Sequence, residues 1–288
     1  MINYNPKNWF NFIFSFHKSD TVRMMWKELI YISLLSIFIT YIEITFFPGA
    51  YFLKNLTNVY SLLGFVISLL LVFRTNTAYD RWWEGRKAWG AIVNDTRSLS
   101  SKLSAFTLSP DENNSFKKLI PLFAFATKQH LRNQNLNEDS SLNMDITGLE
   151  LDGHQPLRII QLVRMELEKL LQKGTIHREA WLALNRDLDS LLNSLGVCER
   201  IKNTPIPFSY SLFIKKFIFI YVVTMPLAFV PLFGYLSAFI STFVFYALVS
   251  MELLAEEIED PFGSDENDLP TDQLCLNIQN NCQQIFGS

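Results

Sequence analysis

The chain has 288 residues, 49% of them hydrophobic and 18% charged, and its formal net charge is −3. This near-neutral balance gives no reason to expect a nucleic-acid partner, because nucleic-acid-binding proteins concentrate positive charge. The mean hydropathy of +0.14 is too low for a chain that lies wholly in a membrane, so a large part of it is expected in water.

The first apolar run, Leu29 to Phe47, predicts a membrane helix over about residues 28–47. Pro48 and the glycine after it end this helix. Glu43 is the only ionisable residue well inside an apolar run, which makes it a functional candidate. Because it precedes Pro48 by about one helical turn, it could also simply reach the outer interface.

The second apolar run, Val59 to Phe73, carries no charge and predicts a membrane helix over about 56–75, close to the ~20 residues that a span needs. Arginine and tryptophan follow at once, and both residue types favour the headgroup level of a membrane. Apolar periodicity continues beyond them, so the helix is expected to run on into a cytosolic helix over about 76–108. This order is not expected of soluble helices and indicates a membrane protein.

Phe65, Leu69 and Phe73 recur at i, i+4 and i+8 in the second run and therefore share one face of the helix. Every neighbouring position is also apolar, so composition alone guarantees some stripe of this kind. Periodicity by itself leaves a functional role for the stripe open.

The stretch after residue 108 also predicts helices. The sequence Ser109-Pro110-Asp111-Glu112 is a start signal for a helix over about 115–132. Residues 157–195 form two amphipathic patterns, which are expected to stop at Gly174 and Gly196. No long stretch has strand periodicity, so the chain is expected to be all-α.

A second pair of membrane helices is predicted over about 215–233 and 236–254, followed by an acidic C-terminal segment over 255–288. Pro205 and Pro207 precede the pair and predict an extended elbow, because proline removes backbone donors from a helix. Basic residues precede the first and the third membrane helix and follow the second. These helix ends adjoin the N-terminal segment and the long middle stretch. By the positive-inside rule, both termini and that middle stretch are cytoplasmic.

Signatures of an enzyme are absent, since the histidines are scattered and the three cysteines form no metal-spaced set. We therefore expect no catalytic residues and no cofactor. Asp265, Glu266 and Asp268 follow a Pro-Phe-Gly turn and could supply the oxygen ligands that Ca²⁺ prefers. Their spacing does not fit an EF-hand loop, and a solvated acidic tail explains them more simply.

Three segments, in this order, resemble the bestrophin family and in particular its bacterial branch. They are Phe73-Arg74-Thr75-Asn76 with Glu84-Gly-Arg-Lys-Ala-Trp-Gly90, then Cys198-Glu-Arg-Ile with Thr204-Pro-Ile-Pro-Phe208, and finally Leu254-Ala-Glu-Glu-Ile-Glu-Asp-Pro-Phe-Gly263. The resemblance covers nearly the whole chain as a single channel domain and leaves a polar loop at 133–156 unmatched.

The resemblance implies an ion channel, of the chloride-conducting type by family, in a bacterial inner membrane. It also implies a homopentamer with one central pore and a hydrophobic neck on the second membrane helix. Here the neck positions are Phe65, Leu69 and Phe73. Stacked apolar rings of this kind can gate by dewetting, because ions do not shed water against hydrocarbon at low cost.

One further set of residues follows from the resemblance, and another from the close-set charges after the neck. A second narrowing near the cytosolic exit is implied, and the candidates on one helix face are Leu184, Leu188 and Leu191. A charged and aromatic junction follows the neck, and we expect its charges to pair with one another between subunits while its tryptophans fill helix interfaces. Its members are Arg74, Asp80, Arg81, Trp82, Trp83 and Glu84.

Two departures from the family pattern affect calcium and selectivity. Ser264 and Asn267 interrupt the acidic run that binds calcium in Ca²⁺-activated animal members, so weak or no Ca²⁺ gating is expected. The neck carries no charge, Leu69 stands where anion channels often have phenylalanine, and the cytosolic part is acidic. Conduction of monovalent cations such as Na⁺ or K⁺ therefore stays open beside chloride.

Two other classes of protein stay open. A secondary transporter would need inverted repeats and broken membrane helices, and only Pro226 is a mid-span breaker. A membrane scaffold would need a polar site for its partner. The partners expected of a channel are membrane lipid, permeating monovalent ions and further copies of the same chain.

Overall fold

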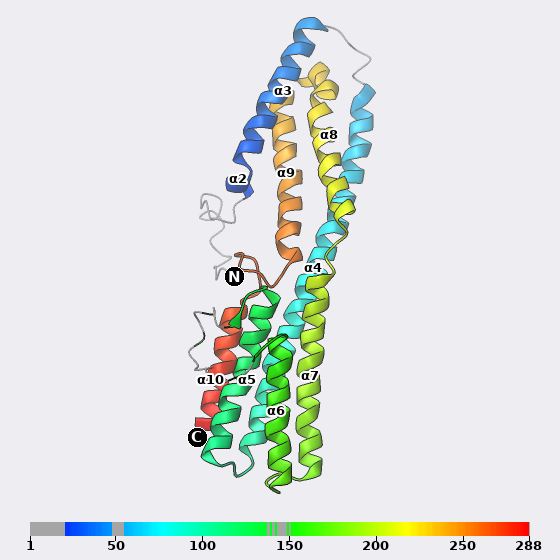
Figure 1. The fold of residues 1–288 in the computed structure, drawn as a ribbon. Helices are drawn as coiled ribbons and strands as arrows, with labels where there is room; N and C mark the ends of the chain where they lie inside the picture. The colour runs from blue at the N-terminus through cyan, green and yellow to red at the C-terminus, as the bar shows by residue number, and fades with distance from the viewer. Residues whose placement is uncertain are drawn as a thin grey trace.

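In the computed structural model, residues 21–47, 55–136, 139, 142, 149 and 151–287 are described, and the regular elements within these residues are all helices. In chain order they are α2 (Thr21–Met24), α3 (Trp26–Phe46), α4 (Leu56–Ser104), α5 (Pro110–Leu131), α6 (Gln155–Gln172), α7 (Arg178–Asn203), α8 (Phe208–Phe233), α9 (Leu236–Glu259) and α10 (Thr271–Gly287). Figure 1 shows an elongated molecule with two groups of helices. The first holds α3, α8, α9 and the start of α4, and the second holds α5, α6, α7, α10 and the rest of α4.

The first group contains the apolar helices. By length and composition, α3, α4, α8 and α9 are each able to cross a membrane, as the sequence predicted. Their inward sides share one apolar core, which includes Ile32, Tyr60, Ile67, Leu71, Ile218, Val222 and Phe245. Their outward sides leave large apolar side chains exposed, such as Leu34, Phe38, Phe239 and Phe243. So much uncovered apolar surface fits lipid or further subunits better than water.

The helix α4 is one uninterrupted element of 49 residues, about 74 Å long at 1.5 Å per residue. Its first half contributes Ile67 and Leu71 to the core of the first group. Its second half contributes Trp89, Ile92 and Leu99 to the core of the second group. A single helix therefore fixes the position of one group relative to the other.

The start of α5 is fixed by hydrogen bonds of two capping side chains and of a lysine from α6. Ser109 and Glu112 form a capping box, in which the Ser109 amide donates to Glu112 Oε2 at 2.9 Å. Lys173, at the end of α6, donates to the other carboxylate oxygen at 2.6 Å. These bonds from Lys173 and Ser109 lower the pKa of Glu112 to about 2. The helix begins at Pro110, ahead of the expected 115, because this cap extends it.

The expected stop at Gly196 was wrong, since α7 continues to Asn203. Cys198 and Ile201 beyond the glycine are buried in the core of the second group. Their burial outweighs the weak helix propensity of glycine, which costs about 1 kcal/mol relative to alanine. Gly174, by contrast, adopts a φ of 75° just after α6, a left-handed conformation that glycine accepts without steric cost.

The acidic C-terminal segment contains a helix that the sequence did not predict, α10. It packs on α4 and α5 through Cys275, Ile278 and Cys282. All three cysteines of the chain are free and buried. Burial raises the pKa of Cys198 to about 12 and that of Cys282 to about 11, so these two thiols stay protonated and unreactive near neutral pH.

Candidate functional site

The three residues of the expected neck lie on an uncovered face of α4. Phe65, Leu69 and Phe73 are 66%, 43% and 54% exposed, whereas Ile67 and Leu71 between them are 1% and 4% exposed. The helix thus turns one face to its own bundle and leaves the other uncovered in a single chain. The stripe is therefore available to lipid or to further copies of the chain.

Two tyrosines hold this part of α4 against α8. Tyr221 Oη donates to the Tyr60 backbone oxygen at 3.2 Å, and the two ring centroids are 5.3 Å apart. A Cβ on Gly64 would lie 2.8 Å from Tyr221 Oη, so a larger residue would displace either the tyrosine side chain or the helix. The orientation of the stripe is therefore set by close packing on its opposite side.

Next to the stripe, Arg74 is a charged side chain that is only 1% exposed. Its Nη2 donates to Glu259 Oε2 at 2.6 Å, and Glu259 Oε1 accepts from the Ile206 amide at 2.6 Å. Nε and Nη1 of Arg74 have no hydrogen-bond partner among the described residues. One carboxylate at the end of α9 thus balances the buried charge on α4 and holds the elbow before α8.

Arg81, about two turns further along α4, binds the same region. Its Nε donates to the Glu259 backbone oxygen at 3.0 Å, its Nη2 to Ile201 O at 2.6 Å, and its Nη1 to Thr204 O. The last two acceptors belong to the C-terminal end of α7, where carbonyls lack helical partners and a positive charge is favourable. The side chain of Arg81 therefore joins α4, α7 and α9.

Two more members of the junction find partners inside the chain. Trp82 Nε1 donates to the Asn267 backbone oxygen at 3.1 Å, and Glu84 forms an ion pair with Arg200. The remaining two members are exposed: Asp80 and Trp83.

Within one chain, both arginines and Glu84 have partners other than one another, and pairing of the junction charges between subunits stays a prediction. These three side chains pair with α7, α9 and the elbow of the same chain, because helices distant in sequence meet there. Sequence reasoning missed Glu259 as the partner of Arg74. A signal was present, since a buried arginine requires an anion and an acidic run ends α9.

The Pro-Phe-Gly turn after α9 packs closely on α4. A Cβ on Gly85 would lie 3.1 Å from the ring of Phe262, so glycine permits this approach. Beside the turn is a hollow of about 270 Å³ whose lining includes Asp260, Asp265 and Asp268. The structure thus gathers part of the acidic segment around one cavity.

Of the three Ca²⁺ candidates, Asp265 and Asp268 line this hollow, and Glu266 does not. Asp268 Oδ2 accepts from the Asp265 amide at 2.6 Å, while the buried Oδ1 has no hydrogen-bond partner in the part of the chain that the structure describes. Within the described residues, these carboxylates do not bring three ligand atoms within 4.8 Å of one another. Weak or no Ca²⁺ gating stays a prediction.

Asp268 is expected to make stability depend on pH. Its pKa is raised to about 6, mainly by burial, with the charges of Asp265 and Asp260 acting in the same direction. A raised carboxyl pKa contributes stability that is present below the unfolded value near 4 and is lost as pH rises through 6. The shift of about two pKa units corresponds to a loss on the order of 3 kcal/mol. Melting temperature measured between pH 4 and 8 should fall less steeply for Asp268→Asn than for the wild type.

The matched control is Asp265→Asn, because Asp265 is exposed and borders the same hollow. Its melting temperature should fall with pH nearly as steeply as that of the wild type, because burial, the main cause of the Asp268 shift, is unchanged and only the smaller contribution of the Asp265 charge is lost. If the melting temperatures of Asp268→Asn and the wild type changed in parallel between pH 4 and 8, Asp268 would not titrate in this range.

The candidates for the cytosolic aperture need correction. Leu184, Leu188 and Leu191 are 1%, 0% and 1% exposed and belong to the core of the second helix group. Side chains packed inside one chain cannot line an opening between chains. Their i, i+4 and i+7 spacing reflects the buried face of α7.

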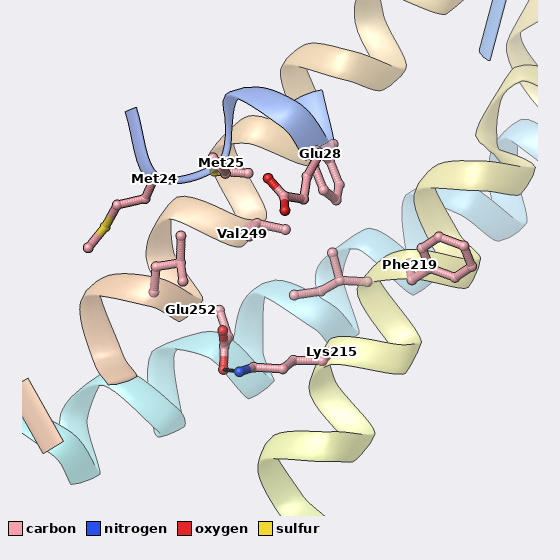
Figure 2. A pocket seen from close by; sticks show the side chains of 10 residues that line it. Met24, Met25, Glu28, Lys215, Phe219, Val249 and Glu252 are labelled. Carbon is pink, nitrogen blue, oxygen red and sulfur yellow. Dashed lines mark ion pairs between the residues drawn. The ribbon is translucent and has the colours of Figure 1, made fainter. Parts of the chain in front are cut away.

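A separate hollow of about 350 Å³ lies where α2 and α3 meet α8 and α9 (Figure 2). Its walls are mostly apolar, but Glu28, Lys215 and Glu252 also border it. Lys215 Nζ lies 3.7 Å from Glu252 and 2.8 Å from Glu256. These ion pairs tie the start of the apolar part of α8 to the end of α9, and the sequence had not indicated this hollow.

Known proteins are similar to this chain in sequence over most of its length. The family model described as "Bacterial/Fungal Bestrophin protein" matches residues 1–284. A voltage-dependent anion channel-forming protein of Synechocystis is 39% identical over 229 residues, which are 77% of this chain and 75% of that protein. A protein of the same description from Nostoc is 33% identical over 287 residues, 97% of this chain and 92% of its own length.

The fold is also shared with solved structures. A bacterial bestrophin homolog from Klebsiella pneumoniae superposes with a TM-score of 0.81 at 28% sequence identity. The match covers 92% of this chain and 99% of that one. The family model and the relatives agree with the resemblance of the three sequence segments. This chain belongs to the bacterial and fungal bestrophin family.

Proposed function

We propose that the chain assembles as a homopentamer in a bacterial inner membrane and conducts monovalent ions passively through a hydrophobic neck. The observation that supports this most directly is the uncovered stripe of Phe65, Leu69 and Phe73 on α4. Its opposite side is packed, so the stripe faces outward from each chain. Copies arranged around an axis would turn it into three stacked apolar rings, which resist wetting and gate the passage of ions.

The sign of the permeating ion is proposed from the relatives. Those from Synechocystis and Nostoc are named anion channel-forming proteins, which favours chloride-type anions here. The neck itself carries no charge, and the nearest cation, Arg74, is neutralised by Glu259. Local charge at the neck is therefore a weak filter, and Na⁺ or K⁺ conduction is the alternative result.

The experiment is a reversal-potential measurement on purified protein in a planar bilayer under a KCl gradient. We expect a value near the chloride equilibrium potential. A value near the potassium potential would keep the channel but overturn the anion assignment. Absence of current from folded protein that native mass spectrometry shows to be pentameric would overturn the channel and favour the transporter. A different subunit number would overturn the pentamer.

A further inference from the structure

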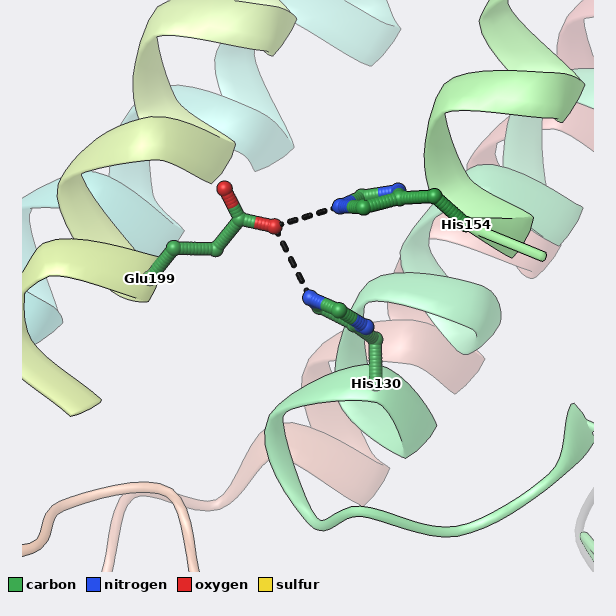
Figure 3. Close-up of side chains that lie close together, drawn as sticks. All are labelled: His130, His154 and Glu199. Atoms are coloured by element: carbon green, nitrogen blue, oxygen red, sulfur yellow. Dashed lines mark hydrogen bonds and ion pairs between the residues drawn. The ribbon is translucent and has the colours of Figure 1, made fainter. Parts of the chain in front are cut away.

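Three side chains from three helices meet in the second helix group (Figure 3). His130 lies in the last turn of α5, His154 is the N-cap of α6, and Glu199 lies on α7. Their ligand atoms all lie within 4.8 Å of one another. Both histidine Nε2 atoms face the same oxygen, Glu199 Oε1, at 2.8 Å from His130 and 2.7 Å from His154. Three elements distant in sequence thus point polar atoms at one place.

The cluster is open to water. The side chains of His130, His154 and Glu199 are 34%, 37% and 28% exposed. An ion can therefore enter without any rearrangement of the helices, and a water molecule can complete its coordination. Ca²⁺ and Mg²⁺ prefer ligand sets made of oxygen, whereas imidazole suits zinc and its neighbours in the first transition series.

We propose that His130, His154 and Glu199 bind a divalent transition-metal ion, with Zn²⁺ as the best fit and water as the fourth ligand. Two imidazoles and a carboxylate with one open position form a ligand set that zinc uses in proteins. Tetrahedral zinc, with bonds of about 2.0–2.1 Å, places neighbouring ligand atoms about 3.3 Å apart. The side chains therefore need to separate by about half an ångström, which their exposure permits.

The proton of His154 can be followed through metal binding. His154 Nδ1 accepts a hydrogen bond from the Leu157 amide at 3.3 Å, so Nε2 of the neutral ring carries the proton and donates it to Glu199. Coordination through Nε2 moves this proton to Nδ1 and breaks the long bond from Leu157. Leu157 is 50% exposed, so water can replace the lost acceptor.

The surroundings of His130 both favour and oppose a metal ion. Burial, and after it the neighbouring His154, lowers the pKa of His130, which favours the neutral ring, the form that coordinates a metal. Lys202 opposes the ion by its charge, but its Nζ already donates to the His130 backbone oxygen and to Asn133 Oδ1. The carboxylate of Glu199 lies closer to the ion than this ammonium group and compensates for it.

The first test is isothermal titration of Zn²⁺ into full-length protein that has been stripped with a chelator and carries no histidine tag. We expect one ion per chain at this site. Glu199→Gln keeps the shape but removes the anionic ligand, and should weaken binding by at least about 100-fold, since loss of an outer-shell partner alone costs about 10–100-fold. His154→Gln should have a similar effect.

The matched control is His177→Gln, because His177 is exposed and its side chain caps nothing. Its zinc affinity should equal that of the wild type. Equal affinities for the wild type, Glu199→Gln and His154→Gln would overturn the proposal. These readouts involve no current, so they are independent of whether the chain conducts ions.

A second measurement requires no variant. Co²⁺ added to the stripped wild type should produce the intense visible absorption of a tetrahedral site, and Zn²⁺ should abolish it by competition. Only the pale absorption of octahedral cobalt, or bands that persist in excess zinc, would overturn the proposed site even if the variants failed to fold.

Discussion

Replacement of Phe65, Leu69 and Phe73 together with alanine is expected to raise the single-channel current about tenfold, which corresponds to a barrier lowered by only ~1.4 kcal/mol. The physical reason is the width of the neck. Alanine removes the ring or branched chain that excludes water, so each ring of the proposed pore becomes wider and easier to wet. Single-channel recording in a planar bilayer at fixed voltage measures the effect.

The control carries the same kinds of substitution on other exposed apolar positions of the membrane helices. Leu34, Phe239 and Phe243 are 63%, 68% and 59% exposed and lie on α3 and α9. Their triple alanine variant should conduct like the wild type. If this control gained current while the neck variant did not, the pore would have to be lined by α3 or α9 and the proposed neck would be wrong.

Glu259→Gln is expected to lower the stability of the chain by about 3–5 kcal/mol, the usual cost of leaving a buried charge without its partner. Arg74 is 1% exposed, and the Glu259 carboxylate is its anion. Glutamine can still accept from the Ile206 amide, so the variant removes the charge and little else. At about 2–4 °C per kcal/mol for a domain of 150–250 residues, the melting temperature should fall by about 10 °C.

Two further variants separate the charge effect from general damage. Adding Arg74→Met to Glu259→Gln removes both charges and should recover much of the lost stability, because an apolar replacement of a buried pair is often neutral. Asp187→Asn breaks the more exposed pair with Lys102, which is worth at most about 1 kcal/mol. A melting temperature for Glu259→Gln equal to that of Asp187→Asn would mean that Arg74 is solvated in the folded protein.

The local features of the chain were predictable because they depend on neighbours in sequence. Apolar runs of sufficient length with few charges predict membrane helices, and four helices able to span a membrane are present. The capping signal at Ser109 and the stop at Gly174 are likewise short-range and were found where expected. The stripe on α4 was predictable as a helix face, since its spacing follows from 3.6 residues per turn.

The errors share one cause, which is packing between distant segments. The spacing of Leu184, Leu188 and Leu191 is the same for a buried face and for a pore-lining face, and only the contacts of α7 with its neighbours decide between them. Helix propensity favoured a stop at Gly196, but burial of the residues after it extended the helix. The helix α10 was missed because its apolar positions are recognisable as a buried face only from their packing on α4 and α5.

The sequence by itself determined the all-α class, the four membrane helices, the continuity of α4 and the family. The tertiary structure alone decided which side chains meet: Glu259 with Arg74, Arg81 with the end of α7, and Glu199 with His130 and His154. The physical reason is the distance along the chain over which each interaction acts. Hydrophobic periodicity and capping act over a few residues, whereas a charge or a ligand finds its partner only after helices far apart in the chain have packed together.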